Sequence, residues 1–206
     1  LEALFNTVPD LPTQIILVPS LLDAHHEFVY PQPPFADKEP VKNAFFEADL
    51  GVLHIPQTTG PNPRVHCLSN PCMFSVNEVV FGVTSNDVLL QLSAEEISMG
   101  APGHRLARLA SHMLNQQSFN PVFPAPANSL AQMDLKQYKH WQMPVTPDVL
   151  VLPSKLAQFA RDVSGCLVVN PGQLAKGRTG GTFARMSVHP IPDEELATLE
   201  QQQQDI

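Results

Sequence analysis

Short apolar runs separated by turn residues form the first pattern along the chain. The runs at residues 14–18, 65–68, 73–76 and 79–84 are rich in β-branched or aromatic side chains and have the length of strands. The last two are separated only by residues 77–78, which is the spacing of a tight turn. The pattern therefore predicts several strands, with a hairpin inside a sheet.

Helical spacing of apolar residues appears in three segments. Residues 87–92 follow Ser85 and Asn86, either of which can cap a helix. Residues 104–115 predict an amphipathic helix, whose apolar face consists of Leu106, Leu109, Ala110 and Met113. Ser154 predicts the start of a third helix, whose inward positions are Leu156, Phe159, Ala160 and Val163.

Further strand patterns fill the second half of the chain. Residues 149–152 and 167–169 are short apolar runs, and residues 182–189 alternate in the manner of a strand. The proline-rich segments 28–63 and 120–147 predict little regular structure beyond short pieces such as residues 51–55. Strands interleaved with helices, with a hairpin among them, predict a mixed α/β fold.

The bulk composition narrows the class of protein. With 206 residues, 43% of them hydrophobic, the chain can bury one sizeable core. Its formal net charge of −8 opposes general binding to a phosphate backbone. No run has the length of a membrane helix, and the first ten residues lack the pattern of a signal peptide. The three cysteines lie in or beside apolar runs, which predicts buried free thiols in a reducing compartment.

A cluster of possible metal ligands follows the first predicted strand. It consists of Asp23, His25, His26 and Glu27. Neighbouring histidines point to different sides of an extended segment, so only Asp23, His25 and Glu27 can face one way. We weigh a divalent-metal phosphoesterase that uses Asp23, His25 and upstream carboxylates against a structural role in which both imidazoles orient the loop through hydrogen bonds, and we favour the structural role.

A second motif resembles a phosphate-binding P-loop. Residues 172–179 match the pattern except that Arg178 replaces the lysine. A P-loop must open a helix, whereas here Gly180 and Gly181 lead into an alternating segment. We therefore expect a glycine-rich connection with solvated Lys176 and Arg178, which can contact an acidic partner, and keep nucleotide binding as a weaker alternative. Ser20 and Ser154 each follow a proline but lack the surroundings of a nucleophile elbow.

Several blocks, in order, resemble the B-subunit family of DNA polymerase alpha. The first block is Pro19-Ser20, Asp23, His25-His26-Glu27 and Tyr30-Pro31-Gln32-Pro33-Pro34-Phe35. Residues 81–87 and 94–98 follow, and the last block runs from residue 144 to residue 185 with Asn170-Pro171-Gly172 and Gly180-Gly181-Thr182-Phe183. The resemblance covers most of residues 14–188.

This resemblance implies a fold and a domain plan. The fold is a calcineurin-like metallophosphoesterase β-sandwich with flanking helices, of which residues 1–190 form the C-terminal part and residues 191–206 an acidic, Gln-rich tail. The strand ends that carry imidazole ligands in an active enzyme correspond to residues 19–23 and 153–156, which contain no histidine. The metal site is therefore expected to be lost, and the earlier ligand motifs would lie upstream of Leu1.

The resemblance also implies a function. We expect a nuclear, non-catalytic accessory subunit without a cofactor, which binds the zinc-containing C-terminal domain of the polymerase alpha catalytic subunit and contacts primase and DNA only through the complex. No membrane contact is expected. The candidate partner-binding residues are His25, His26, Tyr30, Pro31, Pro33, Pro34, Phe35, Lys176 and Arg178.

Overall fold

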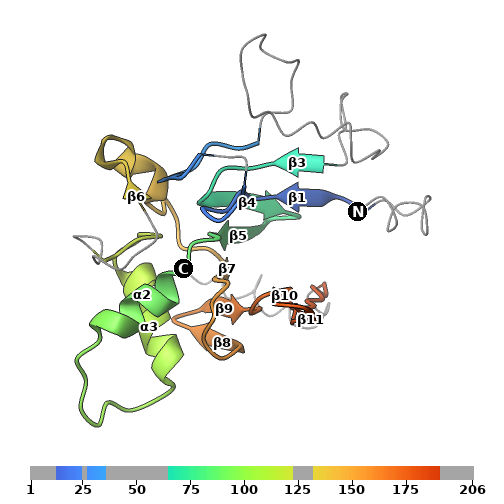
Figure 1. Cartoon of the computed structure of the whole chain (residues 1–206). Helices are drawn as coiled ribbons and strands as arrows, with labels where there is room; N and C mark the ends of the chain where they lie inside the picture. The colour runs from blue at the N-terminus through green and yellow to red at the C-terminus, as the bar shows by residue number, and fades with distance from the viewer. Residues whose placement is uncertain (1–12, 25–26, 36–64, 123–131, 191–206) are drawn as a thin grey trace, which may run out of the picture.

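A computed structural model of the chain describes residues 13–24, 27–35, 65–122 and 132–190 (Figure 1). The predicted strand-like piece at residues 51–55, the pair His25 and His26 and the tail at residues 191–206 lie outside these ranges.

The centre of the fold is a five-stranded mixed sheet. Its strands are β4 (Cys72–Val76), β5 (Val79–Val83), β7 (Val149–Val151), β9 (Cys166–Asn170) and β8 (Phe159–Val163), in that order across the sheet. Strands β5, β7 and β9 are parallel, while β4 and β8 run antiparallel at the two edges. The predicted mixed α/β class and the β4–β5 hairpin are both confirmed.

Two tight turns hold the antiparallel edges. Asn77 and Glu78 join β4 to β5 with φ angles of 46° and 71°. Ser164 and Gly165 join β8 to β9 with φ angles of 55° and 81°. Two successive residues with positive φ match the right-handed twist of the strands that they connect, so each turn fixes the register of its hairpin.

Two helices lie between β5 and β7 in the chain. Helix α2 (Val88–Glu95) begins after Asp87, whose carboxylate accepts the N–H of Leu90. The predicted cap at Ser85 or Asn86 is wrong by one or two residues, because both take part in other hydrogen bonds. Helix α3 (Arg105–Asn115) agrees with the prediction, and its predicted apolar face is buried.

The helix predicted after Ser154 is wrong. The Ser154 hydroxyl accepts the N–H of Leu156, as in a cap, but the chain continues into strand β8. Phe159 and Val163 satisfy helical spacing and also lie on one face of a strand, so spacing alone could not separate the two structures. Pairing of β8 with β9 decides between them, because every residue from Phe159 to Val163 has a partner in β9.

Two other expectations need correction. Residues 182–189 form no strand within the described part of the chain, and their side chains are exposed. The segment 120–147 is more regular than predicted, since it contains β6 (Gln132–Met133) and the 3₁₀ helix η2 (Leu135–Trp141). Strand β6 pairs in parallel with β2 (Val29–Tyr30), and this pairing brings distant proline-rich segments together.

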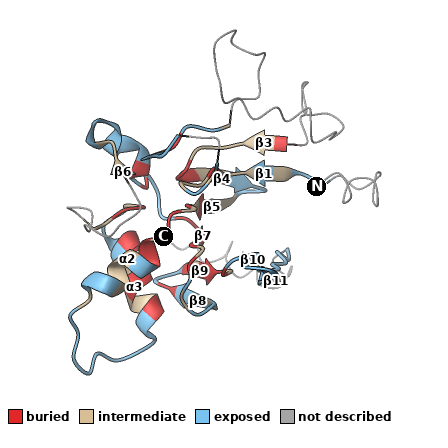
Figure 2. Cartoon of the chain, in the orientation of Figure 1, coloured by how far each residue is buried: buried red, intermediate tan, exposed pale blue. Residues whose placement is uncertain are grey.

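One face of the sheet and the two helices enclose the core (Figure 2). Leu150, Val168 and Cys166 point from the sheet into this core, where they are fully buried. The helices and the following segments contribute apolar side chains that include Leu89, Leu109, Met113, Phe119 and Trp141. The alternate residues of the strands lie on the other face, where Phe74 and Phe81 stack with ring centroids 5.3 Å apart.

Smaller sheets lie around this centre. Strand β1 (Ile15–Leu17) pairs in parallel with β3 (Val65–Cys67), and β10 (Ala175–Lys176) forms a short hairpin with β11 (Thr179–Gly180). Figure 1 shows α2 and α3 packed together beside β8 and β9, with β1 and β3 towards the opposite edge of the sheet. Across the described ranges, each helix is too short or too polar to cross a bilayer.

Candidate functional site

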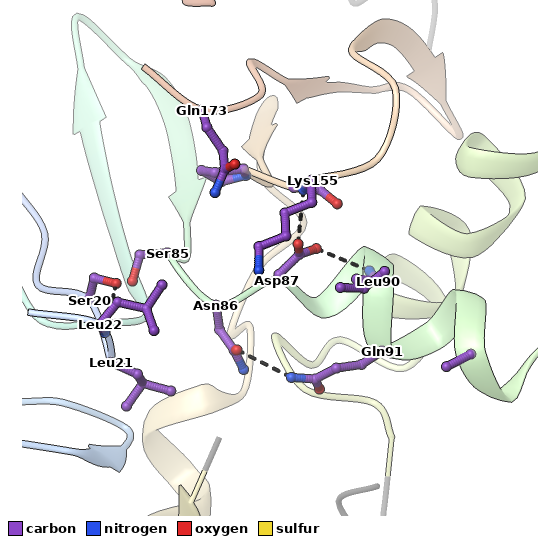
Figure 3. A pocket seen from close by; sticks show the side chains of 13 residues that line it. Ser20, Leu21, Leu22, Ser85, Asn86, Asp87, Leu90, Gln91, Lys155 and Gln173 are labelled. Atoms are coloured by element: carbon purple, nitrogen blue, oxygen red, sulfur yellow. Dashed lines mark hydrogen bonds between the residues drawn. The ribbon is translucent and has the colours of Figure 1, made fainter. Parts of the chain in front are cut away.

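Loops that follow β1, β5, β7 and β9 enclose a pocket of about 460 Å³ (Figure 3). In open α/β sheets, ligands bind at the carboxyl ends of the parallel strands, and the pocket lies at this edge. The two segments compared above with metal-ligand motifs both reach it, through residues 20–22 and 153–155. The structure therefore brings together two segments that are about 130 positions apart in the sequence.

Asp23 folds its own loop and does not line the pocket. Its carboxylate accepts the N–H of Ser20 at 2.7 Å, and its own N–H donates to the carbonyl of Ser20 at 3.0 Å. The turn directs Leu21 and Leu22 to the pocket wall instead. Asp23 is therefore a turn-forming residue in this structure.

Asp87 connects the two sides of the pocket. One carboxylate oxygen accepts the N–H of Leu90 at 3.1 Å, and the other accepts the N–H of Lys155 at 2.9 Å. The first turn of α2 is thus joined to the loop after β7. Figure 3 shows the Lys155 side chain lying across this junction towards Asn86.

The lining of the pocket limits its chemistry. Among the described residues that line the pocket, Asp87 is the carboxylate and Lys155 the cation, and none is a histidine or a cysteine. Within the described ranges, no three His, Cys, Asp or Glu side chains converge as ligands of one ion. A two-metal phosphoesterase needs several carboxylate and imidazole ligands from separate strand ends. The described residues at this edge do not fit such a metal pair.

A buried amide network ties the pocket to the proline-rich loop. The Asn70 side chain accepts from the Thr84 hydroxyl at 2.9 Å and from the N–H of Ser85 at 3.1 Å. Its amide donates to Gln32 at 2.8 Å, and the Gln32 amide donates to the carbonyl of Glu27 at 2.6 Å. Because Asn70, Thr84 and Gln32 are almost fully buried, each of these bonds replaces one to water.

Asn170 has the same role on the other side of the pocket. Its carbonyl oxygen accepts the N–H groups of Ser154 and Gly172, both at 2.9 Å. Its amide donates to the carbonyls of Leu156 at 3.3 Å and Ala157 at 3.1 Å. One buried side chain therefore fixes the loops that follow β7 and β9.

The proline-rich loop contains most of the predicted partner-binding residues. Tyr30 is fully buried and stacks on Trp141 with ring centroids 6.0 Å apart, and this burial raises the pKa of its hydroxyl. Its side chain therefore packs inside the chain and is not presented to a partner. Pro31 and Phe35 are half-buried, whereas Pro33 and Pro34 are exposed. The exposed prolines remain candidates for partner contact, and His25 and His26 lie outside the described residues.

Lys176 and Arg178 lie in the exposed β10–β11 hairpin. No helix follows residues 172–179, so the backbone lacks the helical N-terminus that a P-loop requires. Both side chains are solvated, and the glycine-rich connection that carries them forms a short hairpin. Contact with an acidic partner remains a prediction for both.

Burial sets the protonation state of the Cys72 and Cys166 thiols. Burial raises the pKa of Cys72 to about 11. Burial likewise raises the pKa of Cys166 to about 11, with smaller contributions from Asp148 and Asp162, opposed by a hydrogen bond to Leu150. Thiols with such values stay protonated near neutral pH, so neither is poised as a nucleophile.

Sequence reasoning missed the two buried asparagines that organise these loops. A signal was present, because Asn70 and Asn170 each directly precede a proline, close to a strand end. Proline keeps the preceding residue out of the helical region, so the asparagine side chain can bond to neighbouring backbone groups. Which groups it reaches depends on how the strands pair.

Comparison with known proteins identifies the family. The family model that describes the B subunit of DNA polymerases alpha and epsilon matches residues 1–161. The chain belongs to this family. It is 40% identical to the B subunit of DNA polymerase alpha from Mus musculus over 181 residues, which cover 87% of this chain and 27% of the mouse protein. The Schizosaccharomyces pombe protein of the same name is 41% identical over 134 residues, or 61% of this chain and 23% of its own length.

More distant relatives of the same name match nearly the whole chain. The Drosophila melanogaster protein is 33% identical over 187 residues, which cover 91% of this chain and 27% of that protein. The chain therefore spans about a quarter of the length of the curated relatives that it matches.

Proposed function

We propose that this chain is part of a non-catalytic accessory subunit of the DNA polymerase alpha–primase complex, acting in the nucleus in the initiation of DNA replication. Membership of the B-subunit family carries the proposal. Its partner would be the C-terminal zinc-containing domain of the catalytic subunit, with primase and DNA reached through the complex.

The strand-end pocket supports a structural role. We infer an inactivated phosphoesterase-like fold, because the two segments that would supply imidazole ligands meet at this edge without a histidine. Apolar Leu21 and Leu22 and the cation of Lys155 take their place. An apolar side chain and an ammonium group cannot coordinate a divalent ion.

The loop architecture supports partner binding. Exposed Pro33 and Pro34 stand on a segment that the Gln32–Asn70 pair and the stacked Tyr30 hold in place. A surface that is already ordered loses less conformational entropy when it binds. Such a loop is suited to present a fixed contact surface to another protein of the complex.

The test uses the full-length protein, purified alone and mixed with the C-terminal domain of the catalytic subunit. Size-exclusion chromatography with metal analysis on each peak should give a stoichiometric complex in which the accessory chain contributes no manganese, iron or zinc. Absence of a complex, together with near-stoichiometric metal on the isolated protein, would favour the divalent-metal phosphoesterase instead.

A pair of variants locates the contact. Pro33→Asp together with Pro34→Asp should weaken the complex, because charges at the core of an interface are desolvated without partners. Pro102→Asp, a matched change in the exposed loop between α2 and α3, should leave the complex intact. If the double variant and Pro102→Asp bind the catalytic subunit equally well, the proline-rich loop does not take part in the interface.

A further inference from the structure

The connection between α2 and α3, residues 96–104, projects away from the sheet on the side that the helices cover (Figures 1 and 2). It contains no helix or strand, and every residue from 97 to 104 is exposed. Among the described residues, no backbone N–H of residues 97–103 donates to another backbone group. The connection can therefore be drawn out into an extended conformation without breaking a strand or opening the core.

A single carboxylate holds the start of this connection to α3. Glu96, the residue at which α2 ends, contacts Nε of Arg105 at 2.6 Å through one oxygen and Nη2 of Arg108 at 2.9 Å through the other. The oxygen that contacts Arg108 also accepts a hydrogen bond from the Ser98 hydroxyl at 3.1 Å. The Ser98 hydroxyl and the Arg108 guanidinium group therefore meet at the same oxygen atom.

Arg108 also holds the far end of the connection, through weaker bonds. Its Nη1 atom donates to the carbonyl of Pro102 at 3.3 Å and to those of Ala101 and Gly103 at 3.5 Å each. These distances are at the long end for hydrogen bonds. A guanidinium group binds phosphate more strongly than neutral carbonyls, because two parallel N–H donors match two charged oxygens. A phosphate next to Arg108 would therefore compete with its present partners.

Accessibility separates Ser98 from two other serines of the same region of the sequence. Ser93 lies within α2, where its hydroxyl accepts a hydrogen bond from Nη2 of Arg105 at 2.7 Å. Ser75 is exposed, but it lies in β4, in which every residue pairs with β5. An enzyme that modifies a serine must draw it into its own cleft, which requires local opening of the surrounding structure. Ser98 meets this condition because its segment is unpaired.

We propose that Ser98 is a phosphorylation site whose phosphate binds Arg105 and Arg108 in place of the Glu96 carboxylate. A serine kinase transfers the γ-phosphoryl group of ATP to the Ser98 oxygen. The bond from phosphorus to ADP breaks as the new P–O bond forms, and the hydroxyl proton passes to a base of the kinase. The phosphate dianion repels Glu96 and orders the connection through its arginines.

Phosphorylation thereby moves the tie between the two helices. In the unmodified chain the tie to α3 begins at the residue where α2 ends, whereas in the phosphorylated chain it begins two positions further along the connection. This inference goes beyond the proposed accessory function, and assembly with the catalytic subunit does not depend on it. The complex and the phosphorylation can therefore fail separately.

The first test asks whether Ser98 is modified in the folded protein. The full-length protein is incubated with ATP, magnesium and a nuclear extract of dividing cells, and mass spectrometry locates the phosphate. Phosphate should appear on Ser98, and Ser98→Ala should remove that signal. Ser75→Ala, a matched change of an exposed serine in a paired strand, should leave the signal unchanged.

The second test asks where the phosphate binds. Phosphoserine is incorporated at position 98 of the full-length protein, and phosphorus NMR follows its titration with pH. Contact with Arg108 should shift the midpoint below that of free phosphoserine, about pH 6, because nearby cations favour the dianion. Arg108→Gln should move the midpoint back towards that value. Lys136→Gln, a matched loss of charge on the exposed surface of η2, should leave it in place.

A third measurement tests the exchange of partners. Glu96→Gln should lower the melting temperature of the unmodified protein at neutral pH, whereas it should have little effect once Ser98 carries a phosphate, because the arginines then bind the phosphate.

Three outcomes would overturn the proposal. The first is absence of phosphate from Ser98 in the folded protein, or its appearance only after the protein has been unfolded by heat. The second is a phosphate titration that Arg108→Gln does not shift. The third is an equal effect of Glu96→Gln with and without the phosphate, since the carboxylate would then have kept its arginine partners.

Discussion

At the scale of single residues, buried amides fix the loops around the pocket, and ion pairs tie the end of α2 to α3. Asn170 makes four hydrogen bonds to backbone groups of two loops, and Asn70 joins three segments. Glu96 has the corresponding role at the surface, where its carboxylate contacts Arg105 at 2.6 Å and Arg108 at 2.9 Å. Asn170 and Glu96 each lead to a measurable expectation.

Replacing Asn170 by alanine should destabilise the protein by roughly 2–4 kcal/mol, because buried backbone groups of the two loops lose their partners. Urea unfolding followed by circular dichroism measures the change. Asn115→Ala, at the exposed end of α3, is the matched control and should stay within about 0.5 kcal/mol of the parent. A similar effect of both substitutions would contradict the role given to Asn170.

Glu96 should make stability depend on pH. The hydrogen bond from Arg105, assisted by those from Arg108 and Ser98, lowers the pKa of Glu96 below its ordinary value. A lowered pKa in the folded state means that the contribution is present above the unfolded-state pKa and is lost as pH falls through the folded-state pKa.

The melting temperature of Glu96→Gln should therefore lie below that of the parent at neutral pH and approach it in acid. The neighbouring Glu95→Gln is the control, since Glu95 makes no ion pair among the described residues. A constant difference between Glu96→Gln and the parent across the pH range would show that the ion pair does not contribute.

The buried thiols should resist alkylation. With pKa values near 11 caused by burial, Cys72 and Cys166 remain protonated at pH 8 and are shielded from reagent. Mass spectrometry after iodoacetamide treatment should find both unmodified in the native protein and both modified in guanidinium. Rapid native labelling of either residue would contradict the structure.

At the scale of elements, local turn chemistry and strand pairing decide what each segment becomes. The β4–β5 turn places Glu78 at a φ of 71°, a region that favours glycine or asparagine. Segment 159–163 has spacing that suits either a helix or a strand, and pairing with β9 makes it a strand. Local preferences therefore do not decide between helix and strand where the spacing of apolar residues fits both.

Glu78→Gly should stabilise the protein by about 0.5–1 kcal/mol, because Asn-Gly relieves the strain of positive φ in a two-residue hairpin turn. Thermal and urea unfolding measure the gain. Glu95→Gly provides the opposite control, since glycine in the last turn of α2 should destabilise it. Loss of stability in Glu78→Gly would mean that the Glu78 side chain stabilises the protein by more than its backbone strain costs.

At the scale of the whole molecule, the chain combines a helix-covered sheet with several presented surfaces. The helices cover one face of the five-stranded sheet, and the carboxyl ends of its parallel strands meet loops from both ends of the chain. The proline-rich loop, with exposed Pro33 and Pro34, lies at the surface of this frame. This arrangement fits the accessory role proposed above, which the complex-formation experiment tests.

Much of the fold followed from local patterns. Continuous apolar runs gave β5, β7 and β9, the two-residue spacing gave the β4–β5 hairpin, and helical spacing gave α3. For these elements the prediction agrees with the structure, because the burial pattern and the local preference favour the same secondary structure. The absence of histidine from residues 19–23 and 153–156 was likewise visible in the sequence.

Tertiary structure alone decided the rest. Pairing across the sheet made a strand of β8 and set β6 beside β2, and burial turned Tyr30 from a candidate contact into a packing residue. The pocket exists only because loops remote in sequence meet at the carboxyl ends of the parallel strands. The sequence determines which side chains are available, but hydrogen bonds and burial depend on which distant backbone each one meets, and that is set by strand order and register.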